Sequence, residues 1–167
     1  VMPFWLTGPT IAGRPLAFAV MDRADEVAVM SYRTDLDEVQ DIAEDILRYG
    51  EVSGTPVWLA VETTVLPLEQ HVVLRRETRS GRGDALVDYD RHLLRWAPIP
   101  ETQVVSAHRD WFRVHRRFTV RPERVTFAGR PRAEVSMAVR RILDTTSQRS
   151  FAGVIIHDLD GFQALAE

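Results

Sequence analysis

The chain contains four short apolar runs of the kind that form β-strands. Three of them read VAVMSY, VWLAVE and AGVIIH, and are almost continuous rather than alternating between apolar and polar residues. Strands that are buried on both faces show this pattern, as parallel strands covered by helices do. The four runs, which we expect to form one parallel sheet, lie at residues 2–6, 26–32, 56–62 and 151–157.

Helical patterns separate these runs. The clearest covers residues 35–49, where Thr34 or Asp35 can cap the first turn and apolar residues recur at helical spacing. Alternating strands and helices imply parallel strands joined by right-handed crossovers. Three shorter helical patterns complete the alternation, at residues 14–24, 132–143 and 160–167.

This alternation predicts the C-terminal half of a parallel (β/α)8 barrel. The chain has 167 residues, fewer than the roughly 250 of a complete barrel, and it begins inside an apolar run. We therefore expect residues 1–167 to supply strands five to eight of one TIM-barrel domain and to need the missing N-terminal half as a partner. A small doubly wound sheet fits the length equally well.

Residues 64–130 interrupt the alternation and are expected to form a β-rich insertion after strand seven. An insertion at the carboxyl end of a barrel strand lies on the face where barrels build active sites, although it can also be a variable decoration. Its β-type runs lie at residues 71–76, 86–96, 104–105 and 111–120.

Composition narrows the possible partners. The net charge of −3 gives no reason to expect nucleic acid or an anionic membrane as a partner. No apolar stretch approaches the roughly 20 residues of a membrane span, and without cysteine the chain has no disulfide or thiolate nucleophile. The 21 basic residues are all arginine, which we interpret as coding bias.

Three strand endings resemble known carbohydrate-active barrels. The run 27–32 is similar to the sixth strand of family 18 chitinase-like glycosidases, which often reads Met-Ser/Thr-Tyr-Asp, with Arg33 at the Asp position. Residues 54–63 resemble the seventh strand of bacterial TIM-barrel proteins related to glycoside hydrolases, in which a Gly-x-Pro-Val-x-x-Gly-Val-Glu-Thr strand ends in glutamate. Residues 124–127 and 151–157 resemble the later part of such proteins, whose last strand commonly ends in histidine.

The resemblance implies carbohydrate as the substrate class and a glycoside hydrolase-like activity. The chitinase-type acid lies on strand four, outside the predicted half, so we expect this chain alone to be inactive. Two alternatives remain open: a non-catalytic carbohydrate-binding or structural barrel, and a metal-assisted hydrolase that uses the His-Asp-Leu-Asp stretch at 157–160. We predict no cofactor and no metal.

Glu62 and Tyr32 are the candidate catalytic residues. A carboxylate at the end of an apolar strand is costly to bury unless it is paired or functional. Glu62 is a candidate nucleophile or electrostatic stabiliser, although glycosidases need a second carboxyl group. Alternatively, it forms a structural salt bridge with Arg33. Tyr32 is a candidate hydrogen-bond donor to the substrate or a rim residue that packs under the insertion.

Four further residues are candidate substrate ligands. His157 is a candidate general base or sugar ligand, while Asp158 either contacts substrate or caps the following helix. Arg33 is a candidate partner for a carboxylate or phosphate. Trp5, near the end of the first run, is a plausible stacking platform for a sugar ring.

Overall fold

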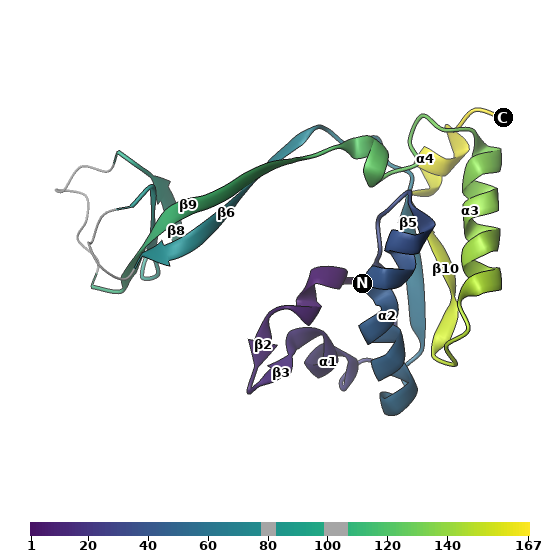
Figure 1. Ribbon diagram of the computed structural model, residues 1–167, viewed down its shortest axis with the longest axis horizontal. Coiled ribbons are helices and arrows are strands. Elements are labelled where there is room, and N and C mark those ends of the chain that lie inside the picture. The colour runs from purple at the N-terminus through teal and green to yellow at the C-terminus, as the bar shows by residue number, and fades with distance from the viewer. Residues whose placement is uncertain (78–82, 99–106) are drawn as a thin grey trace. The chain divides into compact units, whose positions relative to one another are not determined.

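A computed structural model of the chain describes residues 1–77, 83–98 and 107–167 (Figure 1). It divides into two compact units, the first formed by Val1–Pro67 with Arg121–Glu167 and the second by Leu68–Val120. The insertion predicted at 64–130 overlaps the second unit, and the predicted run at 104–105 lies outside the described residues.

The first unit is built on a parallel sheet of four strands in the order β1-β4-β5-β10. The strands are β1 (Met2–Pro3), β4 (Val27–Met30), β5 (Val57–Glu62) and β10 (Phe151–His157). Its helices are α1 (Leu16–Met21), α2 (Leu36–Ser53), α3 (Arg132–Thr145) and α4 (Leu159–Gln163). Short elements complete it: η1 (Phe4–Thr7), β2 (Thr10–Ile11), β3 (Arg14–Pro15) and η3 (Pro122–Arg124).

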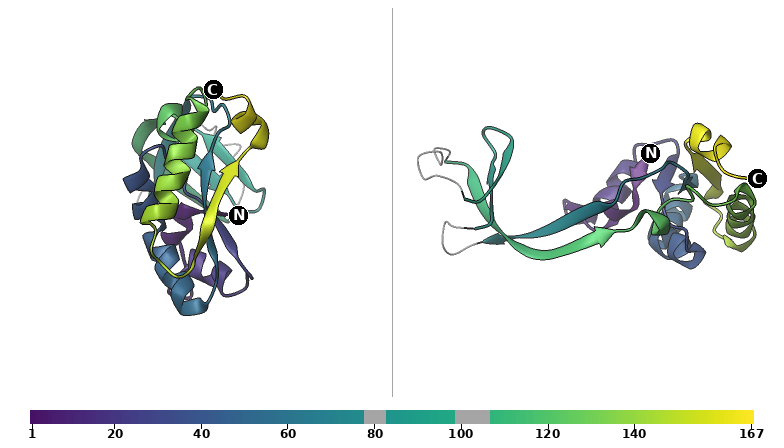
Figure 2. Two further views of the ribbon diagram at one scale, coloured as in Figure 1. Left: turned by 90° about the vertical axis from the view of Figure 1, so that its right-hand side faces the viewer. Right: turned by 90° about the horizontal axis from the view of Figure 1, so that it is seen from above.

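The second unit is an antiparallel sheet of four strands in the order β6-β9-β7-β8. Its two longest strands, β6 and β9, form a ribbon that Figures 1 and 2 show in teal and green. The strands are β6 (Glu69–Glu77), β7 (Ala85–Asp88), β8 (Leu93–Trp96) and β9 (Arg109–Val120).

The prediction of half a (β/α)8 barrel is wrong. The described residues form a small α/β fold with a four-stranded parallel sheet, a separate antiparallel sheet and four α-helices, without regularly repeated strand–helix units. After β5 the chain enters the antiparallel sheet instead of a helix, and β1 has only two residues. Continuous apolar runs indicate that a strand is buried on both faces, but they do not indicate whether its sheet closes into a barrel.

Helix α2 forms where its sequence pattern predicts it. The Asp35 carboxylate accepts hydrogen bonds from the backbone N–H groups of Asp37 and Glu38, which otherwise have no partner inside the helix. Gly54, in the left-handed conformation with φ of 74°, ends the helix. Both α2 and α3 turn apolar faces to the sheet, and α3 runs alongside β10 (Figures 1 and 2).

Successive side chains of β5 point alternately into the core and toward the opposite face of the sheet. Val57, Leu59 and Val61 are fully buried in the core that includes residues of α2 and α3. Glu62, with Trp58 and Ala60, points to the opposite face, because successive side chains on a strand alternate between faces. The register places His157 directly opposite Glu62 at the carboxyl end of the sheet.

Candidate functional site

Glu62 is a buried carboxylate at the last position of β5. Its side chain is only 4% exposed. Burying a charged group in this way is unfavourable unless hydrogen bonds replace the lost water. The surroundings of Glu62 therefore have to supply hydrogen-bond donors.

Three donors surround this carboxylate. One oxygen, Oε1, accepts hydrogen bonds from the backbone N–H groups of Thr63 and Thr64, at 2.9 and 2.7 Å. The other oxygen, Oε2, lies 2.8 Å from Nδ1 of His157. With both oxygens engaged and the side chain enclosed, the geometry favours an orienting carboxylate over a nucleophile that has to reach substrate.

His157 ends β10 and has its ring half exposed, at 54% of the side-chain surface. A carboxylate oxygen only accepts hydrogen bonds, so Nδ1 carries the proton in the contact with Glu62. In the neutral imidazole the other nitrogen, Nε2, then has a free lone pair. Within the described chain Nε2 has no hydrogen-bond partner, so it is available to take a proton or bind a ligand.

Tyr32 lies beside the histidine, two residues beyond the end of β4. The ring centroids of Tyr32 and His157 are 5.6 Å apart, with the planes tilted by 32°. Burial raises the pKa of the Tyr32 phenol, and the negative charge of Glu62 raises it further. Tyr32 therefore remains a neutral O–H donor across the physiological pH range.

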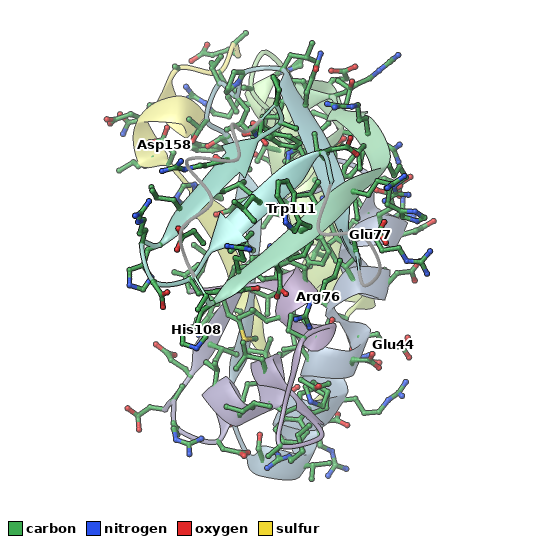
Figure 3. The ribbon with its side chains drawn as sticks, turned by 90° about the vertical axis from the view of Figure 1, so that its left-hand side faces the viewer. Glu44, Arg76, Glu77, His108, Trp111 and Asp158 are labelled. Atoms are coloured by element: carbon green, nitrogen blue, oxygen red, sulfur yellow. The ribbon has the colours of Figure 1, made fainter. Side chains whose placement is uncertain are left out.

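Asp158 and the two threonines fix the end of β10. Asp158 has a positive φ of 70°, and its carboxylate accepts hydrogen bonds from the N–H groups of Asp160 and Gly161 at the start of α4 (Figure 3). The Thr63 hydroxyl lies 2.7 Å from the carbonyl oxygen of His157 and 2.8 Å from that of Asp158. Of the two roles considered for Asp158, the structure shows the helix cap.

The close packing continues at Gly161. A Cβ atom there would lie 2.6 Å from the carbonyl oxygen of Thr63, so only glycine fits without movement of the backbone. The Thr64 hydroxyl donates to the Asp158 carboxylate at 3.3 Å. These contacts hold β5, β10 and α4 together around the Glu62–His157 pair.

Arg33 and Trp5 have other surroundings. The Arg33 guanidinium pairs with Glu38 at 3.2 Å and donates to the Tyr32 carbonyl oxygen, so the alternative of an Arg33–Glu62 salt bridge is not what the structure shows. It also lies over the ring of Phe4. Trp5 belongs to η1 and is 57% exposed. The structure thus gathers four of the six candidate residues: Tyr32, Glu62, His157 and Asp158.

The threonines around Glu62 were not identified from the sequence. Thr63 and Thr64 follow Glu62 directly, and a buried carboxylate needs backbone N–H donors close by, so the sequence could have indicated these two residues. It could not have indicated Thr126 in this way, because Thr126 is distant from Glu62 in the chain. Its hydroxyl lies 3.2 Å from the Glu62 carbonyl oxygen and 2.8 Å from that of Thr64.

Residues 1–77, 83–98 and 107–167 contain no group of three or more His, Cys, Asp or Glu side chains arranged to hold a metal ion. None of the helices in these ranges is long and apolar enough to cross a membrane.

Comparisons of the chain with protein-family models, with curated proteins and with solved structures find no match.

Proposed function

We propose that this chain is a hydrolase acting on a carbohydrate, with His157 as general base. The observation that carries the proposal is the contact between Oε2 of the buried Glu62 and Nδ1 of the half-exposed His157. A carboxylate that accepts the Nδ1 proton leaves Nε2 free to accept a proton from water. The similarity of the strand endings to chitinase-like glycosidases supports carbohydrate as the substrate class.

The bond favoured by this arrangement is an ester of the sugar rather than a glycosidic bond. Glycosidases use two carboxyl groups across the scissile bond. Here the Glu62 carboxylate is engaged on both oxygens, and that of Asp158 caps α4. A histidine base beside a neutral O–H donor is instead the combination used for carbonyl hydrolysis.

The reaction proceeds in two proton transfers. His157 Nε2 removes a proton from water as the water oxygen forms a bond to the ester carbonyl carbon, which places a negative charge on the carbonyl oxygen. Tyr32, kept protonated by its raised pKa, is the donor available to that oxygen. The tetrahedral intermediate then collapses, the C–O bond to the sugar breaks, and the imidazolium returns the proton to the sugar alkoxide. The products are a carboxylic acid and the free sugar hydroxyl.

The experiment measures acid release from acetylated xylan and acetylated cello-oligosaccharides, and reducing-end release from the same polymers. We expect acetate release by the wild type and a loss of about 10²- to 10⁴-fold in kcat/KM for His157→Gln. The matched control is His108→Gln, which removes an exposed histidine paired with Asp90 in the second unit and should retain wild-type activity.

The proposal is tested by comparing the activities of the two variants with wild type and by identifying which of the two products is released. Equal acetate release by wild type and His157→Gln would overturn the role of His157. Reducing ends without acetate would overturn the choice of bond, and hydrolysis of non-carbohydrate esters alone would overturn the substrate class.

A further inference from the structure

The second unit differs from the first in charge. Leu68–Val120 contains ten arginines against seven acidic residues, a formal charge of +3, whereas the first unit has eleven arginines against seventeen acidic residues, a formal charge of −6. A segregated positive region on a chain with a net charge of −3 is a candidate binding surface for anions.

The arginines of the ribbon gather on one face. Arg75 on β6 pairs directly with Arg113 on β9, and Arg116 lies opposite Val73, two positions from Arg75 on the same strand. Since side chains alternate between faces, these three arginines, hereafter the arginine cluster, share a face. All three are exposed.

A β-bulge contributes to this gathering. The register of β6 and β9 shifts between Val73 and Leu74, where His115 is the extra residue on β9. A bulge changes the direction of the side chains beside it. It therefore brings Arg113 and Arg116 to the same face, although their positions along the strand differ by an odd number of residues. The sequence pattern alone therefore places these two arginines on opposite faces, and the structure places them together.

The cluster is incompletely neutralised within the described residues. Arg113 pairs with Glu77 at 3.2 Å. Arg75 and Arg116 have no ion-pair partner in the described ranges, where the Arg116 guanidinium lies over the ring of Phe118. Figure 3 shows Glu77 near Trp111, its cross-strand neighbour. Like charges directly opposite on a ribbon repel each other, so an anion between Arg75 and Arg113 would relieve a repulsion of the free protein.

We propose that the arginine cluster binds a polysaccharide that carries carboxylate groups. Arginine presents a planar fork of donors that matches the two oxygens of a carboxylate. The choice of polysaccharide among anionic polymers rests on the carbohydrate specificity proposed above. The cluster is a binding surface of the second unit, separate from the chemistry of His157.

The surroundings of the cluster favour this ligand over nucleic acid. Proteins that bind single strands stack bases on free aromatic faces. Phe118 beside the cluster is already stacked against His71, 5.2 Å between ring centroids, and covered by the Arg116 guanidinium.

The test is a fluorescence anisotropy titration of the full chain with labelled oligogalacturonate. The triple variant Arg75→Gln/Arg113→Gln/Arg116→Gln should bind about tenfold or more weakly, since it loses charged hydrogen bonds. The matched control Arg48→Gln/Arg140→Gln/Arg149→Gln removes the same charge from exposed arginines of the first unit and should bind within about twofold of wild type. A triple Lys variant at the cluster keeps the charge and should lie between these limits.

The outcomes separate this proposal from the proposed function. Binding that His157→Gln leaves intact, and that the cluster variant weakens, supports the cluster whatever becomes of the esterase activity. Equal binding of wild type and cluster variant, tighter binding of a single-stranded oligonucleotide than of oligogalacturonate, or equal binding of a neutral cello-oligosaccharide would overturn it. A circular dichroism spectrum of each variant checks that the second unit stays folded.

Discussion

The two units each contain a histidine paired with a glutamate; the two pairs have almost the same distance but differ in the burial of the glutamate. In the first unit His157 lies 2.8 Å from Glu62, and in the second His71 lies 2.7 Å from Glu69. The side chain of Glu62 is 4% exposed, and that of Glu69 is 53% exposed. The Glu62 side chain also accepts two backbone hydrogen bonds, whereas the Glu69 side chain has no other hydrogen bond or ion pair within the described chain.

This difference shows that an ion-pair distance does not identify a functional site. An exposed pair is screened by water and contributes little to stability or to orientation. A buried carboxylate held by three donors keeps its partner in one tautomer and one position, which is the requirement for acid–base chemistry. The exposed arginine cluster of the second unit is instead proposed as a binding surface.

The largest expected difference between the two histidine–glutamate pairs is in what each contributes to the free energy of unfolding. Glu62→Ala leaves the Thr64 N–H group and the His157 ring without an acceptor, and the Thr63 N–H group keeps only its 3.2 Å hydrogen bond to the His157 carbonyl oxygen. We therefore expect the free energy of unfolding to fall by about 2–4 kcal/mol. Glu69→Ala should change it by less than about 1 kcal/mol. Urea denaturation of both variants measures this, and equal losses would remove the distinction between the pairs.

The tight packing of the first unit gives a second, smaller effect. Gly153 on β10 has φ of 146°, and a Cβ there would lie 2.8 Å from the Trp58 ring. Gly153→Ala should therefore destabilise the chain by about 1–3 kcal/mol. Gly8→Ala is the control, since φ there is −77° and the nearest atom to the added Cβ lies at 3.4 Å. A thermal melt in which both variants behave alike would contradict this account of Gly153.

The second unit should respond in the opposite direction to loss of a charge. Arg75→Gln removes the repulsion with Arg113, and we expect it to stabilise the ribbon by about 0.2–1 kcal/mol. The control is Arg117→Gln, which lies opposite Val72 and relieves no such repulsion. Hydrogen exchange of the β6 and β9 amides measures the change, and faster exchange in Arg75→Gln than in wild type would count against the repulsion.

The smallest effect is on the titration of Tyr32. Burial and the charge of Glu62 raise its pKa above the ordinary value of 10.0, so the folded state holds this proton more tightly than the unfolded state. The resulting stability is fully present below pH 10.0 and is lost as the pH rises through the folded pKa. Glu62→Gln removes the smaller cause and should lower the pKa only partly. An ultraviolet difference titration against Tyr32→Phe measures it, and an unchanged pKa would contradict the role of the Glu62 charge.

The sequence predicted local structure better than it predicted architecture. The helical pattern at 35–49 corresponds to α2, and the runs 56–62 and 151–157 correspond to β5 and β10. Those patterns depend on local burial and capping, which neighbouring residues determine. Whether the sheet closes depends on contacts between distant segments, so the barrel prediction failed.

For the candidate site, too, local features could be predicted from the sequence and contacts between distant segments could not. Ends of parallel strands meet at one edge of a sheet, so Tyr32, Glu62 and His157 were identifiable as strand-end residues. Their mutual geometry was not, because the register that places His157 opposite Glu62 joins segments 95 residues apart. The bulge that aligns Arg113 with Arg116 likewise requires the pairing of β6 with β9.

The most direct test of the account is the tautomer of His157, read from ¹⁵N chemical shifts of the imidazole at a pH where the ring is neutral. We expect a proton on Nδ1 and a free lone pair on Nε2 in the wild type, since the Glu62 carboxylate accepts the Nδ1 proton. Glu62→Ala should lose this preference. A wild-type ring with its proton on Nε2 would contradict the account, because the nitrogen that faces solvent would then have no lone pair with which to accept a proton.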